Sequence, residues 1–167
     1  TSYYRCLTTC TTSALTSTST VWTMTQKVIT DCYCIPDPMD CTGSDLINYV
    51  AFATMTNTSS CGTDGYSDFT GIVPSATTTA GQTYTLTTVL GSMYGQHTHA
   101  WIDYNKNGVF DSSEYTDLGF NNGNDTIFYT ITIPIGTTPG TTRMRVRNIS
   151  GFSLGSSDAC FTPTFMP

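Results

Sequence analysis

The sequence predicts an all-β protein built around an antiparallel β-sandwich of the immunoglobulin-like or jelly-roll-like kind. Threonine is the commonest of its 167 residues, ten residues are tyrosine, and only 11% are charged. β-Branched and aromatic side chains suit a pleated surface. Short alternating runs are separated by turn clusters such as "PSATTTAG", "NNGND" and "PIGTTPG". This spacing favours an antiparallel sandwich over alternating strands and helices.

Charge and cysteine content place the protein outside the cell or at the cell surface. The net charge is −6, so no basic field is available for nucleic acid,. Seven cysteines are expected where disulfides persist,. The sequence contains no apolar run of about 18 residues, so no membrane-spanning segment is predicted. The opening "TSYYRCLTTC" lacks the pattern of a signal peptide, so we expect a processed or excised piece of a secreted protein,.

Residues 1–30 are expected to be the end of a preceding unit. In "YYRCLTTC", Tyr4 precedes Cys6 by two positions, as in the tyrosine corner of an immunoglobulin-like sandwich,. "TVWTMTQKVI" then alternates like a closing strand,. The segment resembles the C-terminal fragment of an Ig-like repeat of large secreted bacterial surface proteins. Cys6 would then pair with a residue upstream.

Residues 31–45 are expected to form a cysteine- and proline-rich linker, because "DCYCIPDPMDC" suits neither a helix nor a central strand,. The sandwich domain is expected to span 46–167. Its predicted strands are 46–55, 65–70, 82–90, 96–104, 126–134 and 141–149.

The six remaining cysteines allow fifteen connectivities, and the sequence alone does not choose among them. The pairings that we expect are Cys41 with Cys61, Cys34 with Cys160, and Cys10 with Cys32.

The stretch 103–114 matches every specified position of the calcium loop D-x-[DN]-x-[DN]-G-x5-E,. Gly108 would make the sharp turn,. The expected Ca²⁺ ligands are Asp103, Asn105, Asn107, the Val109 carbonyl, Asp111 and Glu114,. The flanks alternate like strands, so this would be an EF-hand-like loop between strands. "NKNG" alone could also be a hairpin turn, and the acids could be the pair of a glycosidase.

Two further sets of polar residues alternate along strands. His97 and His99 share a strand face and could ligate zinc, although a polar strand face is the simpler interpretation,. Arg143, Arg145 and Arg147 also share a face,. They could bind an anionic glycan, or they could form a solvated face paired with acids.

Four segments in the second half resemble the GEVED domain of secreted bacterial proteins in order and spacing. They are "INYVAFATMTNTSSCGTDGYSDFT", "TTTAGQTYTLTT", "AWIDYNKNGVFDSSE" and "ITIPIGTTPGTTRMRVR". The resemblance covers about residues 33–167. The Gly-Glu-Val-Glu-Asp motif itself is absent where it would follow "FTPTFMP", so a missing final strand is expected.

The resemblance implies a non-catalytic module of long surface proteins, often exported by type IX secretion with a C-terminal sorting domain, of which none is visible here. "DTI" at 125–127 resembles the O-glycosylation signal of such proteins, which makes Thr126 a candidate acceptor.

These patterns are consistent with three functions. The first is a non-enzymatic, calcium-stabilised extracellular module in adhesion or as a spacer, whose partners are other domains of the same chain and possibly surface glycans. The second is a filament subunit that joins its neighbours by strand addition. The third is a secreted calcium-dependent hydrolase, although no serine or cysteine stands in a nucleophile motif.

Overall fold

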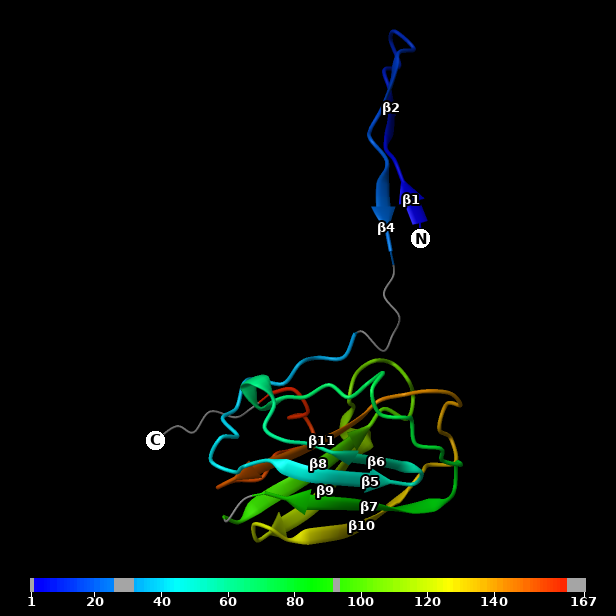
Figure 1. Cartoon of the computed structure of the whole chain (residues 1–167). Helices are drawn as coiled ribbons and strands as arrows, with labels where there is room; N and C mark the ends of the chain where they lie inside the picture. Colours follow the sequence, from blue (N-terminus) through cyan, green and yellow to red (C-terminus); the bar gives the residue numbers. More distant parts are fainter. Residues whose placement is uncertain (1, 26–31, 92–93, 162–167) are drawn as a thin grey trace.

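The computed structural model describes residues 2–25, 32–91 and 94–161, and it is an all-β, sandwich-like structure. A hairpin at the N-terminus is drawn apart from a β-sandwich that holds the remaining strands (Figure 1). The predicted all-β, sandwich-like fold class is confirmed.

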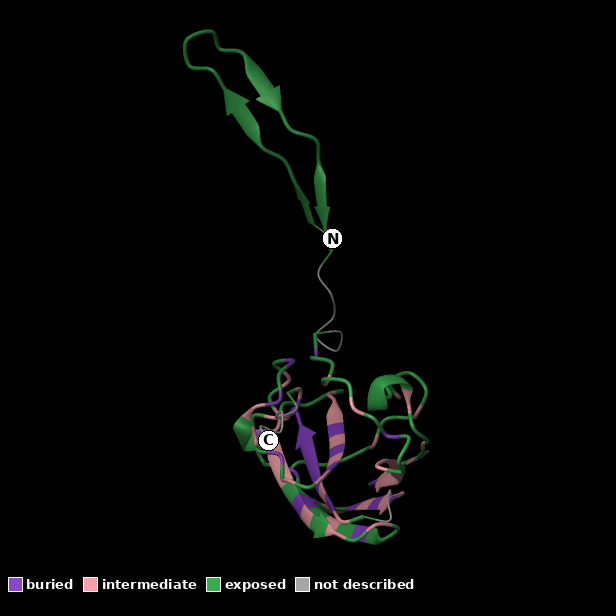
Figure 2. Cartoon of the chain, turned by 90° about the vertical axis from the view of Figure 1, so that its left-hand side faces the viewer, coloured by how far each residue is buried: buried purple, intermediate pink, exposed green. Residues whose placement is uncertain are grey.

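The hairpin contains two short antiparallel pairs along one ribbon. β1 (Ser2–Tyr4) pairs with β4 (Trp22–Met24), and β2 (Leu7–Thr9) pairs with β3 (Thr16–Thr18). Every described residue of this ribbon is exposed, as Figure 2 shows along its whole length. The two strands expected at the end of an Ig-like repeat are thus present as a hairpin, while their membership of such a repeat remains a prediction.

One sheet of the sandwich has four antiparallel strands in the order β10-β7-β5-β6. They are β5 (Ile47–Phe52), β6 (Met55–Thr58), β7 (Thr83–Leu90) and β10 (Thr126–Thr132). The other sheet has three strands in the order β11-β8-β9. They are β8 (Gln96–Ile102), β9 (Tyr115–Asn121) and β11 (Met144–Ser150). Two 3₁₀ turns, η2 (Thr63–Gly65) and η3 (Ser112–Glu114), interrupt the loops.

The three-stranded sheet is covered on both faces, so the domain has three layers. The core between the two sheets contains Phe52, Leu86, Ala100, Ile102, Leu118, Ile131 and Ile133. A second core lies on the opposite face of the three-stranded sheet and contains Tyr33, Trp101, Phe110, Ile149, Leu154 and Ala159. The second core is closed by the chain segments before β5 and after β11. This explains why β8 is buried at every position except His97.

Two of the predicted strands differ from the structure. The strand expected at 46–55 is broken at Ala53, whose positive φ of 50° turns the chain from β5 into β6,. Residues 65–70 form no strand. Asp68 Oδ1 accepts the N–H of Thr70 at 2.9 Å, and this local turn replaces pairing with a neighbouring strand,.

β9 was not predicted from the sequence, because its residues follow the acidic loop directly and include Gly119 at a φ of 81°. The pairing of β8 with β9 shifts register between His97 and His99. Such an irregular strand lacks the strict alternation on which strand prediction depends.

Candidate functional site

The loop 103–114 joins β8 to β9 at one end of the three-stranded sheet. Asp103 directly follows β8, and Glu114 directly precedes β9. Because the two strands are antiparallel neighbours, the two ends of the loop meet,. Lys106 and Gly108 have left-handed φ angles of 61° and 82°, which fold the loop back tightly,.

Asp103 is fully buried, and its carboxylate organises the first half of the loop. Oδ1 accepts the backbone N–H of Lys106 at 2.6 Å, and Oδ2 accepts that of Gly108 at 3.0 Å. The Tyr33 hydroxyl also donates to Oδ2, at 2.5 Å. These donors compensate the buried negative charge.

Glu114 is also buried and ties the end of the loop to its start. Oε1 accepts the backbone N–H of Tyr104 at 2.7 Å. Oε2 accepts that of Asp111 at 3.0 Å, as part of a capping box at η3,. Both oxygens therefore act as acceptors for the backbone, which is a structural task.

Three further candidate ligands converge in the loop. The amide groups of Asn105 and Asn107 donate to Asp111 Oδ2 at 2.8 and 2.9 Å. The amide oxygens accept backbone N–H groups two residues further on, that of Asn107 at 2.9 Å and that of Val109 at 2.8 Å. Consecutive Asx turns of this kind fold the side chains back onto the loop.

The donor set agrees with calcium in chemical class, since calcium takes carboxylate, amide and carbonyl oxygens. Across 2–25, 32–91 and 94–161, however, no group of three His, Cys, Asp or Glu side chains is arranged to hold a metal ion. The calcium prediction therefore rests on residue type and spacing, and the arrangement shown is a loop held by its own hydrogen bonds.

Tyr33 connects this loop to the linker, although no sequence pattern predicted it as a site residue. Besides its bond to Asp103, its ring packs against Phe110 with centroids 5.1 Å apart. The guanidinium carbon of Arg143 lies 4.9 Å from the centre of the same ring. The only sequence signal was an aromatic residue between two cysteines, which does not identify a partner 70 positions away.

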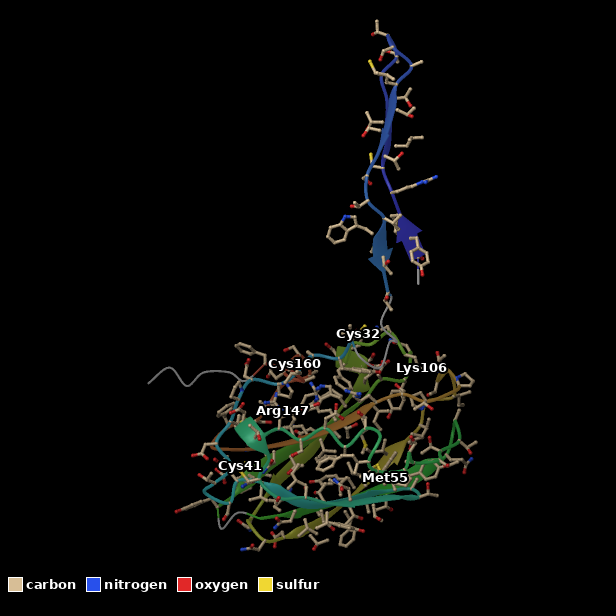
Figure 3. The ribbon with its side chains drawn as sticks, turned by 45° about the horizontal axis from the view of Figure 1, so that its top comes forward. Cys32, Cys41, Met55, Lys106, Arg147 and Cys160 are labelled. Atoms are coloured by element: carbon tan, nitrogen blue, oxygen red, sulfur yellow. A yellow bond between two sulfur atoms is a disulfide. The ribbon has the colours of Figure 1, made fainter. Side chains whose placement is uncertain are left out.

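Arg145 and Arg147 of β11 do not lie on a solvated face, which was one of the two expectations, and their burial gives no support to the other, the binding of an anionic glycan. Arg145 and Arg147 are only 6% and 7% exposed. Arg145 donates to the carbonyls of Cys34 at 2.6 Å and Ala159 at 2.8 Å, and Arg147 donates to Phe161 O at 2.9 Å. Figure 3 shows Arg147 beside the segment that carries Cys160. The two guanidinium groups hold the linker and the segment after β11 against the sheet.

Arg143 differs from its two neighbours in facing an acid. Its guanidinium lies 3.6 Å from Asp68 Oδ2 and donates to the Thr70 hydroxyl at 3.2 Å.

Burial lowers the pKa of Arg147 to about 10, so the Arg147 guanidinium is still charged at neutral pH,.

His99 is a buried structural residue. Its Nε2 accepts the backbone N–H of Leu154 at 3.1 Å, so the proton of the neutral ring lies on Nδ1, 2.9 Å from the Tyr115 hydroxyl,. Tyr115 in turn donates to Leu154 O at 2.8 Å. His97 stacks parallel to His99 with centroids 6.3 Å apart. His99 thus holds the chain after β11 against the sheet.

Two of the three expected disulfides are present. Cys34 is bonded to Cys160, and Cys41 to Cys61. The expected bond between Cys10 and Cys32 is not formed: Cys10 is an exposed thiol near the tip of the hairpin. Residues 26–31, which connect the hairpin to Cys32, lie outside the described residues.

Thr126 is the first residue of β10 and is exposed. An exposed residue is accessible to a modifying enzyme, and the glycosylation of Thr126 remains a prediction. None of the helices in the described parts of the chain is long and apolar enough to cross a membrane.

Comparison with known proteins gives one match. The model of the GEVED domain matches residues 97–165, which include β8, the acidic loop, β9, β10 and β11. No curated protein and no solved structure matches the chain. Residues 97–165 thus match the family to which the sequence was expected to be similar over about residues 33–167.

Proposed function

We propose that residues 33–161 form a non-catalytic extracellular module, stabilised by Ca²⁺ in the loop 103–114, that serves in adhesion or as a spacer of a surface protein. The observation that supports the calcium part most is the convergence of Asn105, Asn107 and Asp111 between two buried acids. The two disulfides support an oxidising, extracellular setting,.

The hydrogen bonds of the loop leave room for a cation. A carboxylate oxygen has two lone pairs, and Glu114 Oε2 accepts one N–H, that of Asp111, so it can also bind calcium,. The oxygens of Asp103 each accept two donors, so a cation bound there would displace one of them. The amides of Asn105 and Asn107 now point their N–H groups at Asp111. A cation near Asp111 would replace these N–H groups, and both amides would have to turn their oxygens toward it.

The contacts of the acids favour a structural role over catalysis. A glycosidase needs two carboxyl groups facing a substrate. Here Asp103 and Glu114 are buried and face backbone N–H groups of their own loop. The hydrolase alternative lacks a supporting observation of this kind.

Calcium titration tests the proposal. Extracellular calcium sites bind with dissociation constants of about 10⁻⁴ to 10⁻³ M. We expect 10 mM Ca²⁺ to raise the free energy of unfolding by about 1 to 3 kcal/mol over EGTA, because the ion binds the folded form alone. Urea denaturation in both buffers measures this difference.

Asp111→Asn is the informative variant, because it removes the charge that faces the two side-chain amides and keeps an amide oxygen that can cap η3,. It should lose most of the calcium effect while it keeps the fold in EGTA. Asp125→Asn, in the exposed turn before β10, makes the same change of charge elsewhere and should respond like the original chain. Equal stability of the original chain in calcium and EGTA would refute the calcium part.

A further inference from the structure

A buried polar cluster lies at the start of β8, at the end of the strand opposite the loop 103–114. Gln96 is the first residue of β8 and is fully buried. Side chains alternate along a strand, so Gln96 lies on the same face as Ala100 and Ile102, which belong to the core between the sheets,. The cluster is separate from the residues on which the calcium proposal rests.

The side-chain amide of Gln96 is held at both of its polar atoms. Its Nε2 donates to Asp45 Oδ1 at 2.8 Å, and its Oε1 accepts a hydrogen bond from Asn148 Nδ2. An ionised carboxylate can only accept hydrogen bonds, so the amide nitrogen faces Asp45 and the amide oxygen faces Asn148. The Gln96 carbonyl therefore has a donor on its oxygen and a carboxylate beside its nitrogen.

Ser150 of β11 contacts the other oxygen of the same carboxylate. Its Oγ donates to Asp45 Oδ2 at 3.2 Å. β11 lies beside β8 (Figure 1), and Ser150 is directly opposite Gln96 in their register. The Cβ atoms of directly opposite residues in an antiparallel pair are about 4.5 to 5.5 Å apart on one face. An ester between the Ser150 oxygen and the Gln96 carbonyl carbon can span such a gap.

These contacts give each group one part in an acyl transfer. Ser150 has the hydroxyl nucleophile, and Asp45 is within hydrogen-bond reach to act as its base,. Asn148 donates to the carbonyl oxygen on which negative charge would develop,. Asp45 also contacts the nitrogen that would leave. One carboxylate therefore faces both the nucleophile and the leaving group.

We propose that Ser150 and Gln96 form an intramolecular ester that joins β8 to β11. The Ser150 oxygen attacks the Gln96 carbonyl carbon, and Asp45 takes the hydroxyl proton. The C–N bond then breaks, and Asp45 returns the proton to the nitrogen, which leaves as ammonia. One C–O bond replaces one C–N bond, nothing is oxidised or reduced, and Asp45 ends ionised as it began.

The fold favours both the formation and the survival of this ester. It holds the reacting groups together, which removes the entropic cost of an encounter. Gln96 is buried, so the water that would hydrolyse the ester is kept away from its carbonyl carbon,. β11 is an edge strand in the order β11-β8-β9. The bond would fasten this edge strand covalently to the middle strand of its sheet.

The first test is the mass of the folded full chain, measured by mass spectrometry after denaturation and reduction of the disulfides. We expect a mass lower than that of the sequence by one ammonia. Trypsin cleaves after Lys106 and Arg147, which separates Gln96 from Ser150 along the chain. The two peptides should nevertheless stay joined in the reduced digest. The unmodified mass would overturn the proposal.

Two variants assign the roles of the cluster. Ser150→Ala removes the nucleophile and Asp45→Asn removes the base, so each should show the full mass of its own sequence. Ser153→Ala and Asp125→Asn make the same changes at exposed positions and should still lack one ammonia. The joined peptides of the original chain decide the case if a variant fails to fold.

Two other outcomes would also overturn the assignment. A mass in which water has replaced ammonia would show that Gln96 is hydrolysed to glutamate and does not react with Ser150. A loss of ammonia that persists in Ser150→Ala, without joined peptides, would place the reaction elsewhere, for example in an imide at Asn107–Gly108.

Discussion

At the scale of single residues, the buried polar side chains of this domain act as structural ties between the sheet and the segments that cover it. His99 accepts a backbone N–H from Leu154, and Arg145 and Arg147 donate to carbonyls on both sides of the Cys34–Cys160 bond. The sequence identified these residues by type and alternation. It could not show that the segment before β5 lies over them, because Arg145 and Cys34 are 111 positions apart.

His99 gives the domain a defined response to acid. Burial lowers its pKa from the ordinary 6.5 to about 4, although the nearby Asp117 carboxylate opposes this shift. The neutral ring is favoured in the folded state, so its stabilisation is complete above about pH 6.5 and is lost as the pH falls toward 4. The loss should reach about 3 kcal/mol.

Urea denaturation between pH 7 and pH 4 measures this loss. In His99→Gln the slope of the unfolding free energy against pH should be much smaller in this window. His97→Gln, which alters the neighbouring ring in the same stack, should keep the slope. An unchanged slope in His99→Gln would show that other groups cause the acid response.

At the scale of structural elements, the loop 103–114 and the linker form one unit joined by Tyr33. The loop was predictable, because its ligand pattern is complete within twelve residues. The docking of the linker onto it was not, because the proline and cysteine pattern indicates only the absence of regular structure. β9 was not predicted for a related reason. Its bulge and Gly119 interrupt the regular alternation of side chains from which β8 was predicted.

Tyr33→Phe tests this unit. The variant keeps the ring contact with Phe110 and removes the hydroxyl that donates to the buried Asp103. A hydrogen bond to a charged buried group contributes about 1.5 to 3 kcal/mol, so the free energy of unfolding should fall by that amount. Tyr3→Phe, at a 70% exposed position in the hairpin, is the control and should have no measurable effect. Equal stability of the two variants would mean that the Tyr33 hydroxyl contributes nothing.

At the scale of the whole molecule, the sandwich is closed by two covalent links of very different span. Cys34 and Cys160 are 126 positions apart, whereas Cys41 and Cys61 are 20 apart. The all-β class was predictable from composition, and the GEVED match from family resemblance. Two of the three expected disulfides are formed, although no sequence pattern selected them among the fifteen connectivities. The three-layer arrangement was not predictable, because the described residues of the outer layer, 32–45 and 151–161, form no helix or strand.

The two links should differ in their contribution to stability. In the chain-entropy model, a longer closed loop restricts the unfolded chain more. The double variant Cys34→Ser/Cys160→Ser should therefore lose about 4 to 5 kcal/mol, and Cys41→Ser/Cys61→Ser about 3 kcal/mol. Denaturant unfolding of both variants measures the difference. The reverse order would show that local packing at Cys41, and not loop length, dominates.

The Cys34–Cys160 bond also decides how the domain carries mechanical tension. The two Cα atoms are 5.9 Å apart, so the polypeptide enters and leaves the domain at almost the same point. A pull applied through the chain on either side passes from one cysteine to the other across a covalent bond. The strands between them lie outside the load path and stay folded while the disulfide is intact. Reduction of this single bond would let the strands unravel under tension and release the chain stored between residues 34 and 160, except for the loops that the Cys41–Cys61 bond and the proposed Gln96–Ser150 ester still close.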